Sequence, residues 1–220
     1  MATSVGVVVF PGTNCEMDAV EAVGGLGGVG RLLWHGDADL GGVDAVIVPG
    51  GFAHGDYLRP GAIARFSPAM AAVARFAADG GPVVGICNGF QVLTEAGLLP
   101  GALQKNAGLK FLCQPTTLRV ESTDSSLTGS AELGAELSIP INHFEGNYTC
   151  DERTLARLRD EERIVLRYVD NPNGSVDDIA GVCNEARNVV GLMPHPERAC
   201  DDLLGSADGA VLLRSLLDAA

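Results

Sequence analysis

Short apolar runs alternate with amphipathic stretches along the first half of the chain. Residues 5–10 read VGVVVF, a continuous β-branched run typical of a strand buried on both faces of a parallel sheet. Similar runs predict further strands at 31–35, 44–49 and 82–87. Strands that alternate with helices over short connections predict an α/β fold, an open and mostly parallel sheet flanked by helices. Its ligand site is expected at the carboxyl ends of the strands.

Residues that favour helix ends fall between these strands. Thr13 and Glu16 have the spacing of a capping box, in which each side chain accepts a bond from the other's backbone amide, so a helix is predicted to begin there. Glycines close the next predicted helix, which spans 67–81. Gly97 caps a third predicted helix, which spans 88–97.

After about residue 105 the pattern changes to β-rich segments separated by turns that contain Asn, Pro and Gly. The closing stretch, 203–220, is amphipathic and predicts a final helix. No repeat or low-complexity linker interrupts the sequence, so residues 1–220 are predicted to form a single domain with a β-rich C-terminal half. The predicted strands of this half are 109–120, 137–144, 163–169, 179–184 and 189–195.

Residues 25–30, GLGGVG, match the dinucleotide-binding pattern G-x-G-x-x-G letter for letter. Such a loop must follow a strand and open a helix, so that the helix N-terminus faces the pyrophosphate. Here the glycines follow the first predicted helix and precede the second predicted strand. We therefore interpret them as a flexible helix-to-strand turn.

Charge and hydropathy narrow the class of protein. With 28 acidic and 15 basic residues, the chain has a formal net charge of −13 and no basic block. Nucleic acid is unfavourable as a main partner, because neutralising phosphates requires clustered Lys and Arg. The longest apolar runs fall well short of the roughly 20 residues that a membrane span needs. No targeting segment precedes the first strand, so we expect a soluble, cytoplasmic protein with no membrane partner.

The six cysteines lie far apart, with no C-x-x-C pair and no Cys/His cluster at metal-ligand spacing. Neither a metal site nor a disulfide framework is predicted. Most of the thiols are expected to be small buried hydrophobes in a reducing compartment. The six positions are Cys15, Cys87, Cys113, Cys150, Cys183 and Cys200.

One cysteine stands apart by its context. Cys87 ends the fourth predicted strand, and a predicted helix begins immediately after it. A side chain on such a sharp turn is held at the top of the sheet, and the turn demands small neighbours, here Gly85 and Gly89. The helix N-terminus also stabilises negative charge on the sulfur. Cys87 is therefore a candidate nucleophile.

A thiol nucleophile needs a proton acceptor, and four histidines compete for that role. His195 ends an apolar strand and lies between two prolines that stiffen the backbone. In an extended segment His195 and Glu197 point the same way, so the carboxylate orients the imidazole. The pattern predicts His195 as general acid/base and Glu197 as its orienting acid. The other histidines are His35, His54 and His143.

Acyl transfer also requires hydrogen-bond donors for the oxyanion of the tetrahedral intermediate. The candidate donors are the amides of Gly51, in the PGG stretch after the third predicted strand, and of Asn88, the residue after the candidate nucleophile. Each feature alone is more often structural, because cysteines at strand ends are mostly packing residues and glycine pairs are mostly turns. Their joint occurrence at the carboxyl ends of predicted strands favours a cysteine-dependent acyl-transfer enzyme.

Three motifs occur in the order and at the usual spacing of one enzyme family: PGG at 49–51, GICNGFQ at 85–91 and MPHPE at 193–197. On these motifs the chain resembles the class I, triad-type glutamine amidotransferases, and the resemblance covers nearly the whole chain. Within the family, VVFPGTNCEMD at 8–18 and GGFAHGDYLRPGAIA at 50–64 resemble the glutaminase subunits that serve de novo purine biosynthesis.

The resemblance implies a flavodoxin-like fold and hydrolysis of glutamine at Cys87 through a γ-glutamyl thioester. It also implies a role for each residue that matches the family's motifs. These residues are Cys87, His195 and Glu197 for the catalytic triad, Gly51 and Asn88 for the oxyanion hole, and Gln91, His143 and Glu145 for glutamine binding.

The resemblance further implies that ammonia passes to a separate, large synthetase subunit, which binds ATP and Mg²⁺. A small third subunit often completes such a complex. No cofactor and no metal are expected in this chain. The GDYLR stretch, with Asp56 and Arg59, is implied to lie near the partner subunit or the ammonia path.

One segment departs from the family pattern. Where the family commonly has A-H-G-E-G facing the glutamine site, this chain reads NHFEG at 142–146, so Phe144 replaces a glycine and changes the backbone contacts there. Two alternatives stay open. One is a glutaminase that serves another ammonia-using synthetase. The other is a noncatalytic, redox-sensitive protein of the same fold, and the distal His-Pro-Glu sequence counts against it.

Overall fold

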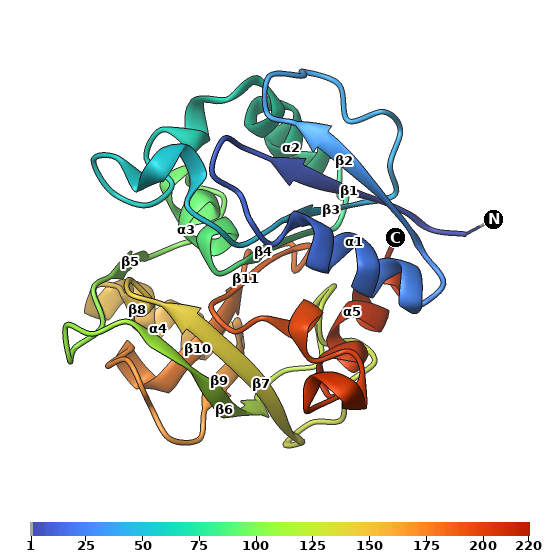
Figure 1. Ribbon diagram of the computed structural model, residues 1–220. Helices are drawn as coiled ribbons and strands as arrows, with labels where there is room; N and C mark the ends of the chain where they lie inside the picture. The colour runs from blue at the N-terminus through green and yellow to red at the C-terminus, as the bar shows by residue number, and fades with distance from the viewer. Residues whose placement is uncertain (1) are drawn as a thin grey trace.

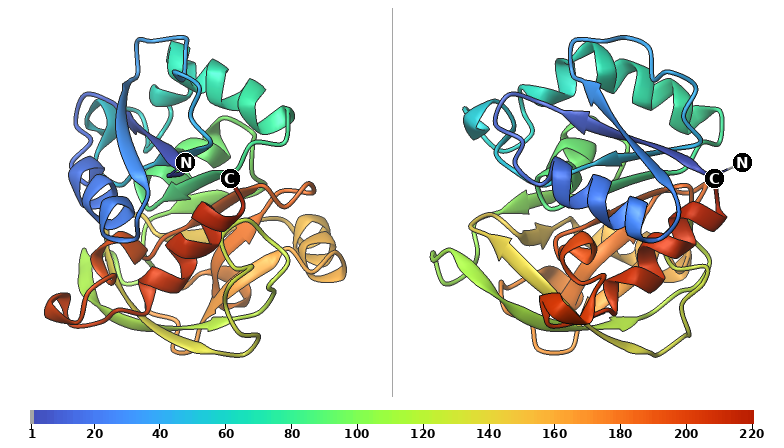
Figure 2. Two further views of the ribbon diagram at one scale, coloured as in Figure 1. Left: turned by 90° about the vertical axis from the view of Figure 1, so that its right-hand side faces the viewer. Right: turned by 45° about the vertical axis from the view of Figure 1, so that its right-hand side comes forward.

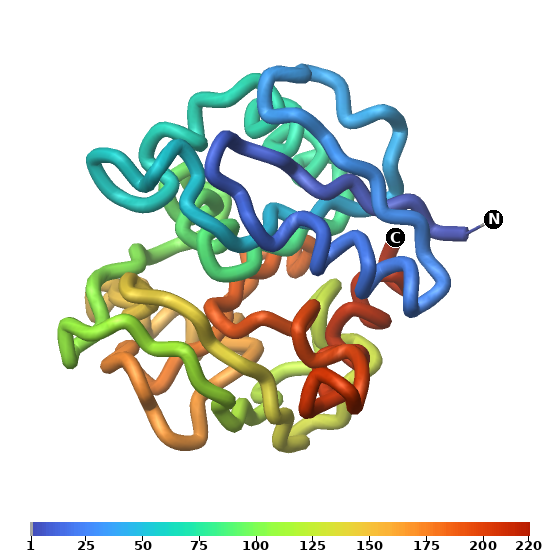
Figure 3. The backbone as a smooth tube through the Cα atoms, in the orientation of Figure 1, coloured from blue at the N-terminus to red at the C-terminus, as the bar shows by residue number. Residues whose placement is uncertain are grey.

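The computed structural model describes residues 2–220. The main sheet has nine strands in the order β2-β1-β3-β4-β11-β10-β9-β6-β7, and a second, small sheet pairs β5 with β8. Figure 1 shows how the main sheet continues from the blue N-terminal strands into the strands of the second half, and Figure 3 follows the same path as a tube. The predicted α/β fold with an open, helix-flanked sheet is confirmed.

Strands of the first half form the parallel part of this sheet. They are β1 (Ser4–Val9), β2 (Val29–Trp34), β3 (Ala45–Val48) and β4 (Val83–Ile86), each within two residues of its predicted range. β3 and β4 are buried along their whole length, as continuous apolar runs predict for strands covered on both faces. β11 (Val189–Leu192) pairs in parallel with β4 and extends this part of the sheet.

Helices cover both faces of the parallel part (Figures 1 and 2). α1 (Glu16–Gly25) and the closing helix α5 (Gly209–Asp218) pack on one face and contact each other. α2 (Pro68–Ala78) and α3 (Asn88–Glu95) pack on the opposite face. The glycines at 25–30 connect α1 to β2, so the dinucleotide pattern is a helix-to-strand turn, as predicted.

The second half continues the sheet with antiparallel pairs, from β11 through β10, β9 and β6 to β7. All five predicted β-rich segments contain strands. Besides β11 these are β6 (Leu112–Val120), β7 (Glu136–His143), β9 (Ile164–Tyr168) and β10 (Ile179–Cys183). Within the described residues, no helix has the length and apolar character needed to cross a membrane.

One α-helix and two β-strands are not predicted by the sequence pattern. α4 (Glu152–Asp160) has a typical N-cap residue, Asp151, whose side chain accepts a hydrogen bond from Thr154 N at 2.7 Å. β5 (Ala102–Gln104) and β8 (Asn147–Thr149) pair as a short antiparallel ribbon. Strands of three residues are too short for alternation to be detected.

The capping box predicted at the start of α1 is wrong. The helix begins at Glu16 with Cys15 at the N-cap, and no side chain caps it. Thr13 Oγ1 instead accepts a hydrogen bond from Phe10 N at 2.9 Å. The hydroxyl therefore stabilises the turn that follows β1. A Thr side chain can accept from a nearby backbone amide in a turn or from an amide of the helix's first turn, and here it does the former.

The turn from β4 into α3 brings the helix very close to the sheet. A Cβ added to Gly89 would lie 1.8 Å from the carbonyl oxygen of Val48, and one added to Gly85 would lie 2.7 Å from the backbone of Gly89. Backbone atoms occupy both spaces, so no rotamer change makes room for a larger residue. The two glycines are what allow α3 to begin directly beside β3 and β4.

Gly89→Ala is expected to lower the free energy of unfolding by at least about 2 kcal/mol, because α3 must move away from β3 to admit the methyl group. The matched control is Gly24→Ala in α1, where an added Cβ meets no atom within 4 Å. That variant should be neutral or slightly more stable. Denaturant unfolding compares the two, and a Gly89→Ala protein as stable as the unaltered chain would contradict this packing.

Candidate active site

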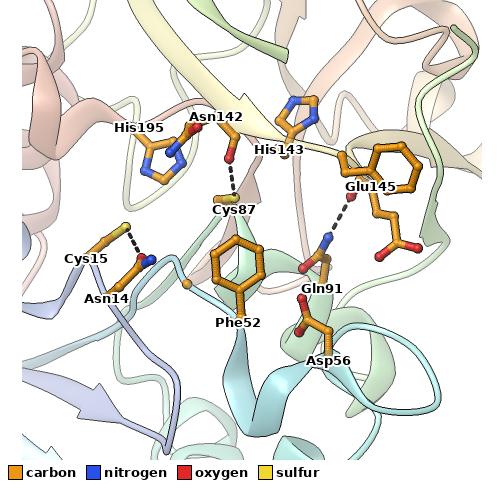
Figure 4. A pocket seen from close by; sticks show the side chains of 12 residues that line it. Asn14, Cys15, Phe52, Asp56, Cys87, Gln91, Asn142, His143, Glu145 and His195 are labelled. Carbon is orange, nitrogen blue, oxygen red and sulfur yellow. Dashed lines mark hydrogen bonds between the residues drawn. The ribbon is translucent and has the colours of Figure 1, made fainter. Parts of the chain in front are cut away.

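The carboxyl ends of β1, β3, β4 and β11 converge on one pocket, shown in Figure 4. This is the edge at which α/β sheets place their ligand sites. The end of β7 and the segment after it close the pocket on the other side. The lining residues are Asn14, Cys15, Gly51, Phe52, Asp56, Cys87, Gln91, Asn142, His143, Phe144, Glu145 and His195.

Cys87 occupies a strained backbone conformation at the turn between β4 and α3. Its φ is 52° and its ψ is −107°, a region that residues other than glycine rarely adopt. The residue is 6% exposed, and its Sγ lies 3.7 Å from the carbonyl oxygen of Asn142, to which it donates. β4 ends at Ile86 and α3 begins at Asn88, so the predicted strand-to-helix elbow is confirmed.

His195 and Glu197 form a buried pair. His195 Nδ1 lies 2.6 Å from Glu197 Oε1, and both side chains are only 1% exposed. The prediction of an extended segment here is wrong, because Pro196–Arg198 forms a 3-10 turn. A proline at the first position of a helical turn has the right φ and loses no hydrogen bond. The turn brings the carboxylate back onto the imidazole, so the predicted pairing is present although its backbone differs.

The surroundings of His195 favour the protonated ring. Burial alone lowers the pKa of His195, but the Glu197 carboxylate and the Cys87 sulfur raise that pKa well above its ordinary value. Nε2 is buried and has no hydrogen-bond partner among residues 2–220. One ring nitrogen is therefore fixed by Glu197, and the other is available to exchange a proton with a neighbouring group.

The two amides predicted as oxyanion donors lie after neighbouring strands. Gly51 has a φ of 145°, and an added Cβ would lie 2.7 Å from Asn14 N, so only glycine fits there. Asn88 N belongs to the first turn of α3, where helix amides have no internal partner. Within the described chain neither N–H has a hydrogen-bond acceptor. Both are therefore available to a ligand.

The Asn88 side chain connects the elbow to the loop after β3. Its Oδ1 accepts from Ala53 N at 2.9 Å, and its Nδ2 donates to Asp56 Oδ1 at 3.0 Å and to Gln91 Oε1 at 2.8 Å. Gln91 Nε2 then donates to the carbonyl oxygen of Glu145 at 2.6 Å. The two side-chain amides thus link the nucleophile turn, the loop after β3 and the segment after β7.

His143 lies buried at the end of β7. Its Nδ1 is 3.1 Å from Asn106 Oδ1, and Gly146 packs on its ring so closely that an added Cβ would lie 2.2 Å from Cε1. Burial lowers the pKa of His143 to about 4, and the charge of His195 adds to the effect. His143 is therefore neutral near pH 7. Phe144, which stands where the family commonly has glycine, lines the same pocket.

Comparison with known proteins identifies the family. Residues 2–208 match the model described as the CobB/CobQ-like glutamine amidotransferase domain. The chain belongs to this family. The resemblance to glutamine amidotransferases that the PGG, GICNGFQ and MPHPE motifs carry is confirmed.

Individual amidotransferases of this family match over nearly their whole length. Two curated relatives are named phosphoribosylformylglycinamidine synthase subunit PurQ. That of Rubrobacter xylanophilus is 62% identical over 98% of both chains, and that of Koribacter versatilis is 54% identical over 97% of both. A chain in the structure titled "Structure of PurLQS from Thermotoga maritima" superposes with a TM-score of 0.91 at 43% identity, covering 99% of each chain.

Several residues of this amidotransferase pocket escape prediction from sequence. Cys15 and Asn142 line it; both lie in stretches that resemble the family or its glutamine-facing segment, but neither was assigned a role from the sequence, and only the tertiary fold brings Cys15 to Cys87. Asp56, expected near the partner or the ammonia path, lines the glutaminase pocket itself. Arg59 does not line it, and its Nε lies 2.5 Å from Glu95 Oε1 in an exposed ion pair.

Asp56 is held in the pocket by an unusual loop. His54, Gly55, Asp56 and Leu58 all have positive φ. Burial raises the pKa of Asp56 from 3.8 to about 6, the hydrogen bond from Asn88 opposes this, and the charge of Glu145 adds to it. The amidotransferase pocket thus contains a carboxyl group that changes charge slightly below neutral pH.

The raised pKa of Asp56 makes stability depend on pH. Because the folded protein binds more protons than the unfolded chain between the two pKa values, stability is lost as pH rises from about 4 through about 6. Asp56→Asn removes this loss. The difference in free energy of unfolding between the variant and the unaltered chain should therefore shift in the variant's favour as pH rises from about 4.5 to about 7.5. The shift is about 1 kcal/mol, because Asp56 is partly exposed to solvent.

Urea unfolding at the two pH values measures this gain. The matched control is Asp160→Asn at the exposed end of α4, which should gain nothing. A difference between Asp56→Asn and the unaltered chain that is the same at both pH values would contradict the raised pKa.

Proposed function

We propose that the chain is the glutaminase subunit of phosphoribosylformylglycinamidine synthase, which hydrolyses glutamine and supplies ammonia for de novo purine biosynthesis. The observation that carries the chemistry is Cys87 on its strained elbow, beside a buried His195–Glu197 pair joined at 2.6 Å. The choice of subunit is supported by identities of 62% and 54%, over nearly the whole chain, to proteins named for it.

Catalysis begins at the Cys87 sulfur. Sγ attacks the γ-carbonyl carbon of glutamine, and His195 holds the thiol proton on Nε2. Glu197 fixes the ring through Nδ1 and stabilises the imidazolium charge. The pKa of His195 is raised well above its ordinary value by Glu197 and Cys87 against the effect of burial, so the ring is a strong acceptor for the thiol proton.

The γ-carbonyl oxygen becomes an oxyanion as the sulfur adds. The unpaired amides of Gly51 and Asn88 are proposed to donate hydrogen bonds to it. The intermediate collapses when His195 gives its proton to the nitrogen, which leaves as ammonia while the γ-glutamyl thioester remains on Cys87. Water, deprotonated by His195, then attacks the thioester carbonyl, and glutamate and the free thiol are released.

The remaining pocket residues are proposed to hold the glutamine backbone. The carboxylates of Asp56 and Glu145 border the pocket and suit an α-ammonium group. Gln91 is held by hydrogen bonds at both ends of its amide, so it presents a fixed polar surface. Neutral His143 forms part of the wall together with Phe144, whose ring adds an apolar surface.

The acceptor for the ammonia is proposed to lie on a separate, large synthetase subunit, which binds ATP and Mg²⁺, with a small third subunit in the same complex. The PurLQS title of the superposing structure supports an assembly of this kind. In this proposal residues 1–220 act as a single amidotransferase domain in the cytoplasm, and the chain itself uses no cofactor.

Cys87→Ala is expected to lower glutamine-dependent amidine formation by the reconstituted complex at least ~10³-fold, because no other group forms the thioester. Ammonia-dependent formation by the same complex should persist, since the substitution leaves the synthetase and its contacts in place. Steady-state rates with glutamine and with an ammonium salt as nitrogen source measure the two activities.

The matched control is Cys113→Ala on β6, an exposed cysteine that should keep both activities. Loss of both activities in Cys87→Ala would assign this residue a structural role. Glutamine-dependent activity that survives the substitution would overturn the nucleophile. Activation of the chain by the synthetase of another pathway, and not by that of the purine pathway, would overturn the choice of subunit.

A further inference from the structure

A second thiol reaches the catalytic pair from the N-terminal end of α1. Cys15 is 1% exposed, and one ligand atom each from Cys15, His195 and Glu197 lie within 4.8 Å of one another. Figure 4 shows Cys15 and His195 on the same side of the pocket, with Cys15 at the start of α1. The mechanism described above gives this thiol no role.

Two atoms of this cluster are buried without a partner. His195 Nε2 and Glu197 Oε2 have no hydrogen bond among the described residues, and the two residues are 1% and 3% exposed. Buried polar atoms are normally paired, so unpaired ones mark a place where a ligand is expected. The catalytic cycle uses Nε2 of His195, but it leaves Oε2 of Glu197 unused.

Cys15 Sγ lies between a hydrogen-bond acceptor and a donor, and it donates to Asn14 Oδ1 at 3.1 Å. Arg198 Nη2 donates to Cys15 Sγ at 3.3 Å. Arg198 Nε is bonded to Asp18 Oδ2 at 2.8 Å, so the charge of the guanidinium is balanced by a carboxylate outside the cluster. Once a bound ion has displaced the thiol proton, the Cys15 sulfur and the Glu197 carboxylate place two negative charges around a single imidazole.

Thiolate sulfur, imidazole nitrogen and carboxylate oxygen together are the donor set that zinc prefers. Zinc bonds of about 2.0 to 2.3 Å in tetrahedral geometry place two ligand atoms roughly 3.4 to 3.6 Å apart. The ligand atoms of the cluster already lie within 4.8 Å of one another, so movements of about 1 Å complete three corners of a tetrahedron. Water supplies the fourth corner.

We propose that Cys15, His195 and Glu197 bind a zinc ion, and that the bound ion reversibly blocks glutamine hydrolysis. When the ion binds, Cys15 loses its thiol proton and His195 loses the proton of its ligating ring nitrogen, both to solvent, and the freed lone pairs form the bonds to the ion. An ion on Nδ1 replaces the hydrogen bond to Glu197, and an ion on Nε2 removes the proton acceptor of Cys87. In either arrangement His195 can no longer accept the proton of the Cys87 thiol.

An approach to this cluster is available from two sides. Cys15 and His195 line the glutamine pocket, while His195 and Glu197 also line a groove between α1 and the segment 198–204. The ion is an inhibitor in this proposal, and the chemistry of glutamine hydrolysis does not require it. Zinc binding itself is independent of the proposed function, whereas its effect on glutamine hydrolysis rests on that function.

Binding is tested first, without any measurement of activity. The full-length chain is titrated with ZnCl₂ against a chromophoric chelator. The unaltered protein should bind one equivalent, and Cys15→Ser should bind it at least ~10-fold more weakly. The control is Cys150→Ser, a half-buried thiol outside the cluster, which should bind zinc as the unaltered chain does.

Co²⁺ can replace Zn²⁺ and be detected by its absorption spectrum. This second measurement uses Cys87→Ser, so it does not depend on whether Cys15→Ser folds. Cys87→Ser keeps all three ligands, so it should still show a thiolate-to-cobalt charge-transfer band when Co²⁺ is added. Absence of zinc binding by the unaltered chain would overturn the proposal. So would undiminished binding by a folded Cys15→Ser protein, or loss of the cobalt band in Cys87→Ser.

The consequence for activity is tested in the reconstituted complex. Zinc should inhibit the glutamine-dependent reaction, and Cys15→Ser should need at least ~10-fold more zinc for half-inhibition, each protein being compared with its own zinc-free rate. Ammonia-dependent turnover reports any effect of zinc on the synthetase. Zinc binding without inhibition would overturn the blocking step alone, and a zinc-free complex that hydrolyses no glutamine would overturn the proposed function instead.

Discussion

The strained backbone of Cys87 is the constraint on which the site depends. Its φ of 52° and ψ of −107° lie where a side chain costs about 1 to 3 kcal/mol. The conformation persists because β4 fixes the chain on one side and α3 on the other, and α3 is locked in place where Gly89 packs against the carbonyl of Val48. This one turn sets the position of the sulfur and leaves the neighbouring Asn88 amide unpaired.

Strand order brings the other groups to this turn. β4 lies between β3 and β11, so the residues that follow those two strands flank Cys87 although they are far apart in the sequence. Gly51 comes from the β3 side and His195 from the β11 side. The Asn88 side chain then ties the elbow to Asp56 and Gln91, so glutamine binding and the oxyanion donor share one buried network.

Site residues could be predicted from the sequence where they directly follow an apolar strand, because the end of that strand is also where the pocket forms. Cys87, Gly51 and His195 each follow a strongly apolar strand, and the family motifs made their roles expected; the structure brings Cys87 and His195 into one pocket and pairs His195 with Glu197. The short strands β5 and β8 left no pattern to detect, and Pro196 favoured a 3-10 turn over the expected extended segment. The place of Cys15 was beyond prediction, because it lies about 180 positions from its neighbours in the cluster.

The central claim is that Cys87, and not the second thiol in the same pocket, is the nucleophile that attacks glutamine. Alkylation of the complex by a diazoketone analogue of glutamine, followed by peptide mass mapping, tests this most directly. A single adduct on Cys87 is expected, and it should form more slowly when glutamine is present in excess. Modification of Cys15 or Cys113, with Cys87 left unlabelled, would contradict it.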